Sequence, residues 1–168
     1  LFDNEATLRI ISISNDFKNK KDNENVRFFP QFSSKISFPL FKSSKSSSQT
    51  LTPIIMPIIA PYNNYTSHKN ITNSNLFSKN RASSLTESES GPRINYGIEW
   101  FNTNKDNFDI KVTAGQSLKF NKEKNDTNEE LSDFYITSNL IFNDNKYFNN
   151  SLIIDKDSHD VKTNNANL

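Results

Sequence analysis

The amino-acid sequence predicts an all-β chain whose strands form an antiparallel meander. Three observations predict this fold class. Apolar and polar residues alternate in several segments, these segments are about ten residues long, and the connections between them are alternately short and long. Successive side chains on a strand point to opposite faces of the sheet, so this alternation gives each strand one apolar and one polar face.

The clearest strand is predicted over residues 108–120. Its even positions are mostly apolar and its odd positions are polar or small. The even set is Phe108, Ile110, Val112, Ala114, Gln116, Leu118 and Phe120, and the odd set is Asp109, Lys111, Thr113, Gly115, Ser117 and Lys119. At helical spacing the same apolar residues would scatter around the axis, so the pattern favours a strand.

The same alternation predicts strands over residues 94–100, 134–142 and 28–40. Tyr135 and Ile141 depart from it, because they are apolar at positions that are otherwise polar. Less regular alternation predicts two further strands over residues 6–14 and 149–155. We expect the apolar set of every strand to lie on one face and polar residues such as Arg93, Asn95 and Lys111 on the other, together with Thr113.

The predicted connections differ systematically in length. Residues 42–49, 102–107 and 143–146 are short turns rich in Asn, Asp or Ser, whereas residues 17–25, 63–91 and 121–130 are longer and polar. Short turns at one end and long loops at the other are typical of an up-and-down barrel of an outer membrane. A soluble antiparallel sandwich also has one buried and one wet face, so the pattern alone leaves both architectures open.

Proline complicates one predicted strand. Pro53, Pro57 and Pro61 fall in one segment of strand length, and each removes a hydrogen-bond donor from a sheet. Because the three positions have the same parity, the missing N–H groups would all face the same neighbouring strand. The segment is therefore either a strand that is well paired on one side and loose on the other, or an extended segment outside the sheet.

Composition narrows the class of protein. Only 33% of the 168 residues are hydrophobic, which by itself suggests disorder, but 14 phenylalanines and a net charge of +1 oppose that reading. The near-zero net charge also argues against a nucleic-acid partner, which would require a basic face. The longest apolar run, Pro53–Pro61, is about half the ~20 residues that a membrane-spanning helix needs.

Five sequence blocks, in order over roughly residues 27–120, resemble the LptD family of outer-membrane proteins. The motif residues are Arg27 and Pro30 in the first block, Pro53 in the second, Asn75, Leu76, Phe77, Asn80 and Arg81 in the third, Gly91, Arg93, Tyr96 and Gly97 in the fourth, and Gly115 and Gln116 in the fifth. The second block is the proline-containing apolar run, and the third is the Asn-Leu-Phe segment with its Asn-Arg end.

The resemblance implies that residues 1–168 are a piece of a large transmembrane outer-membrane β-barrel, without the family's periplasmic jellyroll domain. It implies a structural part of the lipopolysaccharide translocon in the outer membrane of a Gram-negative bacterium, with no enzymatic activity and no cofactor. The implied partners are an LptE-like lipoprotein in the barrel lumen, an LptA-like periplasmic bridge that binds through the jellyroll, lipopolysaccharide and outer-membrane lipid. The loop of residues 63–91 would then be extracellular.

Two other functions remain open at this point. The chain is alternatively part of another outer-membrane barrel, a porin or receptor, or it is a secreted soluble β-sandwich that binds a surface ligand. Fractionation distinguishes the sandwich, because a soluble protein needs no detergent.

Few residues suggest chemistry. His68 and His159 lie in polar segments without the convergent donors of a metal site, so we expect solvated loop histidines. Glu87-Ser88-Glu89 is most simply an exposed, hydrated loop. Arg81 has two readings: it folds the long loop back onto acidic groups of the lumen, or it is an ordinary exposed charge.

Overall fold

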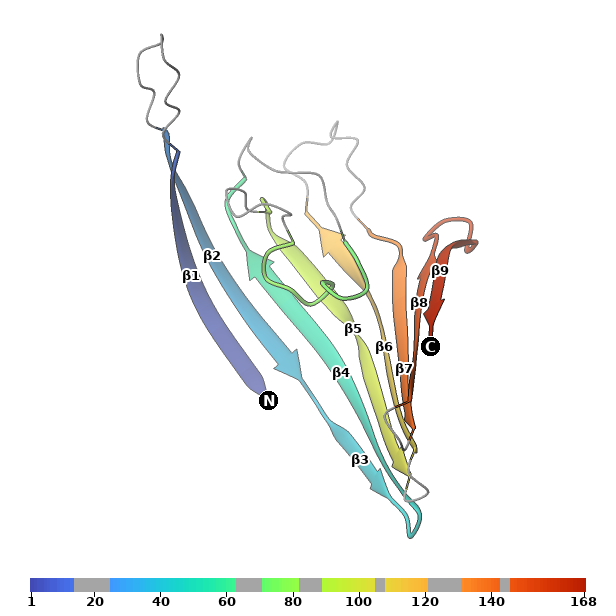
Figure 1. Ribbon diagram of the computed structural model, residues 1–168. Helices are drawn as coiled ribbons and strands as arrows, with labels where there is room; N and C mark the ends of the chain where they lie inside the picture. The colour runs from blue at the N-terminus through green and yellow to red at the C-terminus, as the bar shows by residue number, and fades with distance from the viewer. Residues whose placement is uncertain (14–24, 63–70, 82–88, 105–107, 121–130, 143–145) are drawn as a thin grey trace.

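A computed structural model describes residues 1–13, 25–62, 71–81, 89–104, 108–120, 131–142 and 146–168. In these residues nine strands form one antiparallel sheet (Figure 1). The strands are β1 (Phe2–Ile13), β2 (Asn25–Ser37), β3 (Leu40–Ser43), β4 (Ser47–Ile59), β5 (Arg93–Asn104), β6 (Phe108–Lys119), β7 (Phe134–Phe142), β8 (Tyr147–Ile154) and β9 (Val161–Asn167). The described residues contain no helix that is long and apolar enough to cross a membrane.

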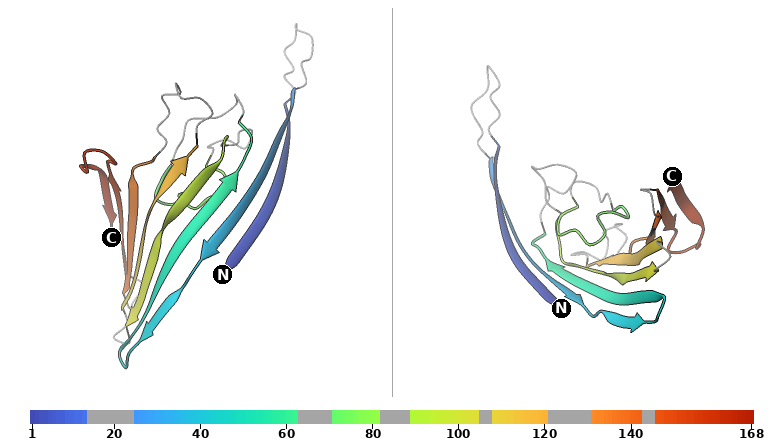
Figure 2. Two further views of the ribbon diagram at one scale, coloured as in Figure 1. Left: turned by 180° about the vertical axis from the view of Figure 1, so that it is seen from behind. Right: turned by 60° about the horizontal axis from the view of Figure 1, so that its bottom comes forward.

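The strands follow one another in space as they do in the sequence. The order across the sheet is β1-β2-β4-β5-β6-β7-β8-β9, with β3 paired to β4 beyond the end of β2. The sheet is strongly curved, and Figure 2 shows it curling around the segment that precedes β5. This all-β antiparallel meander confirms the predicted fold class, and all the described strands belong to the one sheet.

The two faces of the sheet differ as the alternation predicts. Residue pairing places Ile98 beside Ala114 on one face, and Ala114 beside Ile136 on the next strand. The same register places Glu99, Thr113 and Thr137 together on the other face. The apolar set lies on the convex face, where many large side chains are exposed, among them Leu8, Ile10, Phe32, Ile55, Ile59 and Ile98. The polar set, including Arg93, Asn95, Lys111 and Thr113, lies on the concave face.

The predicted alternation of connection lengths is confirmed. The connections β3–β4, β5–β6 and β7–β8 are short and lie at one end of the sheet, where Ser44 donates its backbone N–H to Ser47 O over 2.8 Å. The strand ends that border the long connections β1–β2, β4–β5 and β6–β7 lie at the opposite end (Figure 1).

Two strands differ from the prediction. The expected strand over residues 28–40 is divided at Phe38-Pro39 into β2 and β3, although the register to β4 continues unchanged across the break. Strand β9 was not predicted, because Val161–Asn167 is polar almost throughout and shows no alternation. It pairs with β8 through its backbone, which requires no apolar face.

The proline segment is a paired strand. From Ser47 to Ile58, β4 pairs with β5 without interruption, whereas its pairing with β2 covers only Ile54–Ile59 and is broken opposite Pro57. The backbone N–H of Phe38 donates to Pro53 O over 3.1 Å, so the prolines of β4 turn toward β2 and β3. Of the two readings, the strand with one loose side is therefore correct.

Candidate functional site: a strap across the concave face

Residues 71–81, which we call the strap, cross the concave face between strands that are far apart in the sheet (Figure 1). The strap begins with a turn in which Thr72 N donates to Asn75 Oδ1 over 2.7 Å and Ser78 N to Asn75 O over 2.8 Å. Asn75, a motif residue, thus shapes the strap itself. Other strap residues contact the sheet.

One anchor of the strap is Asn73. Its amide nitrogen donates to Ile136 O of β7 at 2.8 Å, to Ser151 Oγ of β8 at 2.5 Å and, more weakly, to Leu152 O at 3.3 Å. The single side chain therefore ties the strap to two neighbouring strands at once.

The middle of the strap packs on a pair of glycines. Gly97 of β5 and Gly115 of β6 lie directly opposite each other. A Cβ atom on Gly115 would lie 2.9 Å from Leu76 Cδ2, and one on Gly97 would lie 3.0 Å from Phe77 Cζ. The absence of side chains at the two glycines lets the Leu-Phe pair reach the sheet backbone. Leu76 is buried there, as are the neighbouring concave-face residues Ile54, Met56 and Ile58.

At the other end of the strap, Lys79 reaches β1, β2 and β5. Its carbonyl oxygen accepts hydrogen bonds from Gln31 Nε2 of β2, at 2.5 Å, and from Arg93 Nη2 of β5. Its ammonium group forms an ion pair with Glu5 of β1. The strap therefore connects β7 and β8 at one end with β1 and β2 at the other.

A buried ion pair joins Arg81, the last residue of the strap, to Glu89. Arg81 donates through Nε to Glu89 Oε2 at 2.8 Å and through Nη2 to Glu89 Oε1 at 2.5 Å, a bidentate arrangement. Arg93 lies 3.3 Å from the same carboxylate, and Asn80 Oδ1 accepts the Glu89 backbone N–H over 2.9 Å. Glu89 and Arg93 are 6% and 1% exposed, so water hardly screens these charges.

The charge on Glu89 is stabilised despite its burial. Desolvation by itself would raise the pKa of the carboxyl group. Hydrogen bonding from Arg81 and the positive charges of Arg93, Arg81 and Lys119 outweigh desolvation, so the pKa of Glu89 lies below its ordinary value of 4.5. The carboxylate is therefore charged at neutral pH.

The cluster continues into the sheet through Asn95. Asn95 Oδ1 accepts a hydrogen bond from Ser117 Oγ over 2.8 Å and lies 3.5 Å from Arg81 Nη1. All three side chains are buried. The polar end of the concave face is thus a connected network that links the loop to β5 and β6.

Gly91 sets the direction in which the chain enters β5. Its φ of +80° is a backbone conformation that favours glycine, and its N–H donates to Pro61 O over 3.1 Å. The ring of Tyr62 lies against it, and the Tyr62 hydroxyl donates to Phe120 O over 2.8 Å. The two ends of the long β4–β5 connection therefore lie side by side.

The other motif residues lie apart from this site. Tyr96 and Gln116 are on the convex face, where the Tyr96 hydroxyl donates to Gln116 Oε1 over 2.8 Å and Gln116 Nε2 donates to Ser132 O over 3.0 Å. Pro30 and Pro53 lie on β2 and β4, and Arg27 contributes its backbone to the pairing of β2 with β1.

The burial of Arg81 and Glu89 tests two of the expectations drawn from the sequence. Arg81 is buried, so its reading as an exposed charge is wrong; its acidic partner is Glu89 of the same connection rather than an acidic residue of a strand. The expectation that Glu89 is exposed is wrong for the same reason, whereas Glu87 lies outside the described residues. His159 is exposed in the β8–β9 turn, as expected, and His68 lies outside the described residues.

Sequence reasoning missed most of the residues that fasten the strap to the sheet and to the network beside it. Glu5, Gln31, Asn73, Lys79, Asn95 and Ser117 were not singled out as site residues. The alternation of the strands could have indicated two of them, because Asn95 lies on the same face of β5 as Arg93 and Ser117 lies on the same face of β6 as Lys119. No group of three or more potential metal ligands gathers among the residues that the structure describes.

Comparison with known proteins agrees with this architecture. The model of the LptD family, described as LPS transport system D, matches residues 11–168. The chain matches none of the curated proteins with which it was compared. LptD proteins act in lipopolysaccharide transport at the outer membrane and are not an enzyme family. Because the match covers nearly the whole chain, this chain belongs to the LptD family.

Proposed function

We propose that this chain forms wall strands of a transmembrane barrel in the outer membrane of a Gram-negative bacterium, with the convex face toward lipid and the concave face toward the lumen. The single observation that carries the proposal is the difference between the two faces of one curved sheet. Large apolar side chains are exposed on the convex face, whereas the concave face carries charged and polar residues and buries its apolar residues, such as Ile58, beneath the strap. In hydrocarbon every backbone group needs an internal partner, and a closed barrel of antiparallel strands supplies one.

The strap supports this orientation. It places the buried charges of Arg81, Glu89 and Arg93 on the concave face, away from the exposed apolar side chains of the convex face. Short turns at one end and long loops at the other match the periplasmic and extracellular ends of known barrels. The strap, residues 71–81, then lies in the lumen.

The function that follows is a structural role in the lipopolysaccharide translocon, which inserts lipopolysaccharide into the outer leaflet. The wall strands would surround an LptE-like lipoprotein in the lumen, and a jellyroll domain of the intact protein would contact an LptA-like periplasmic bridge. This chain would contribute the wall and the strap, which the motif residues Leu76 and Phe77 hold together by packing on Gly97 and Gly115.

Two measurements test the proposal. The intact protein should fractionate with the outer membrane and require detergent for extraction; extraction with salt alone would contradict a membrane-spanning wall. It should also purify with an LptE-like lipoprotein, and its depletion should lower the amount of lipopolysaccharide at the cell surface. A protein that spans the membrane but shows neither property would instead be a porin or receptor.

A further inference from the structure

The joint between β2 and β4, which we call the seam, is incompletely paired. Pairing across the seam begins at Phe32–Ile59, ends at Ser37–Ile54 and is interrupted opposite Pro57. On its other side β2 pairs with β1 over the full length of both strands, and β4 pairs with β5 from Ser47 to Ile58. The seam therefore joins two well-paired units by a short ladder.

Prolines on both strands remove donors from the seam. The N–H of Ser37 donates to Leu1 O, and the N–H of Phe38 donates to Pro53 O. The backbone N–H and C=O groups of odd-numbered residues in β2 therefore point toward β1, and those of even-numbered residues point toward β4. By this alternation Pro30 lies with its missing N–H toward β4. Pro53 and Pro57 have their missing N–H groups toward β2 and β3. The weakness of the seam thus comes from both of its edges.

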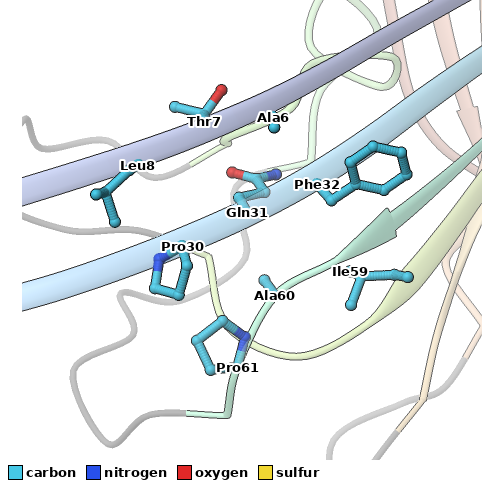
Figure 3. A pocket seen from close by; sticks show the side chains of 9 residues that line it. All are labelled: Ala6, Thr7, Leu8, Pro30, Gln31, Phe32, Ile59, Ala60 and Pro61. Atoms are coloured by element: carbon cyan, nitrogen blue, oxygen red, sulfur yellow. The ribbon is translucent and has the colours of Figure 1, made fainter.

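Beyond the Phe32–Ile59 pair the two strands part. A groove of about 650 Å³ opens between them, lined mostly by apolar side chains. Figure 3 shows Leu8 and Pro30 on one side of the groove and Ile59 and Pro61 on the other. The pairing of β2 with β4 ends at Phe32–Ile59, so backbone hydrogen bonds do not hold this end of the seam closed.

The strap crosses the seam from the concave side. The Lys79 carbonyl accepts from Gln31 of β2 and from Arg93 of β5, and the Lys79 ammonium pairs with Glu5 of β1. We call these three contacts the clasp. Because the clasp joins β1 and β2 to β5 across the end of β4, it lies where the ladder of the seam is missing.

We propose that the seam is a two-state joint that the clasp holds closed. With the clasp released, the β1–β2 hairpin moves away from β4 as one unit. It moves as a unit because its own ladder of twelve pairs, Phe2–Ile36 to Ile13–Asn25, is complete, whereas the seam keeps only the pairs near Ile54–Ile59. Every contact in the clasp is made by a strap residue, so seating of the strap sets the state of the joint.

Hydrogen exchange in the intact protein tests the proposal. The double variant Glu5→Gln with Gln31→Leu removes two contacts of the clasp and leaves the strap sequence unchanged. The matched control is Glu99→Gln, which breaks the Glu99–Lys111 ion pair, of similar exposure and 2.8 Å in length, within the fully paired β5–β6 ladder. Amide exchange over residues 25–37 should rise about five- to tenfold in the double variant and stay unchanged in the control.

A crosslink separates seam opening from fraying of β2 itself. The chain has no cysteine, so Ser37→Cys with Ile54→Cys introduces one pair of thiols at facing positions of the seam. In the double variant, oxidation of this pair should restore slow exchange in β2. Unchanged exchange in the double variant, an equal rise over β5 and β6, or fast exchange that persists after oxidation would each overturn the proposal.

Discussion

Arg81 and Glu89 form a buried bidentate ion pair that closes the end of the strap, and Arg93 lies against the same carboxylate. The Glu89→Gln variant would leave two buried guanidinium groups without a negative partner. Removing one member of a buried pair typically costs about 3–5 kcal/mol, so we expect the strap to leave the sheet. Limited proteolysis of the intact protein should then cut within residues 71–81, while Glu99→Gln, which breaks an exposed pair, should leave the strap protected.

Acid should release the strap through the same carboxylate. The pKa of Glu89 is lower in the folded protein than its ordinary value of 4.5, so its ionisation stabilises the fold at higher pH. That stabilisation is fully present above about 4.5 and is lost as the pH falls through the lower, folded pKa. Protease protection of the strap, followed from pH 7 downward, should fall below pH 4.5; a Glu89→Gln variant should show no such step.

The glycine pair should not tolerate a side chain. A Cβ on Gly115 would lie 2.4 Å from the Tyr96 carbonyl oxygen, a backbone atom that cannot turn away, and 2.9 Å from Leu76 Cδ2. We therefore expect Gly115→Ala to destabilise the protein by about 1–3 kcal/mol. Thermal unfolding in detergent measures the change. Ala114→Ser, on the other face of the same strand, is the control, and equal midpoints for both variants would contradict close packing at the glycine.

Asn73 should be needed as an amide and not only for its size. Asn73→Asp keeps the shape but replaces the N–H donors by a negative charge beside the carbonyl oxygens of Ile136 and Leu152. This end of the strap should therefore detach, and Asn73→Ala should have a smaller effect of about 1–2 kcal/mol. A spin label or fluorophore near the strap reports detachment. If the aspartate variant were as stable as the parent, the anchor would be dispensable.

Restoring a donor at the seam should tighten it locally. Pro57→Val returns an N–H that points toward β2, which we expect to slow exchange of the β2 amides about fivefold. Loss of the proline ring also makes the unfolded chain more flexible, which lowers the free energy of unfolding by about 0.4–1 kcal/mol. This loss offsets the new hydrogen bond, so the overall melting temperature should change little. The same substitution at Pro61, which follows β4, is the control, and it should leave β2 exchange unaltered.

The sequence predicts the sheet better than it predicts the strap. Alternation places Arg93, Lys111 and Thr113 on one face because the geometry of a strand has a fixed period of two. Residues 71–81 have no periodicity, so nothing local indicates where Leu76 lies. Resemblance selects Leu76, Phe77, Gly97 and Gly115 as motif residues, but only the register of β5 with β6 shows that they meet.

The burial of the charged residue Glu89 is the feature that the sequence predicts least well. Glu89 follows other polar loop residues, and an acidic residue in such a segment is usually hydrated. Its burial depends on Arg81 and Arg93, which approach it only once the loop has folded onto the sheet. The polar strand β9 was missed for a related reason, because its backbone rather than its side chains pairs it with β8.

The strap also fixes an order of events during assembly. Asn73 needs the backbone of β7 and β8, and Lys79 needs Gln31 of β2, so the strap can seat only after strands on both sides of it are in place. Contacts between segments so distant in the chain form late, because the entropy of closing the intervening loops must be lost first. Docking of the strap therefore marks the completion of this section of the wall, and the time at which it becomes resistant to protease measures that completion.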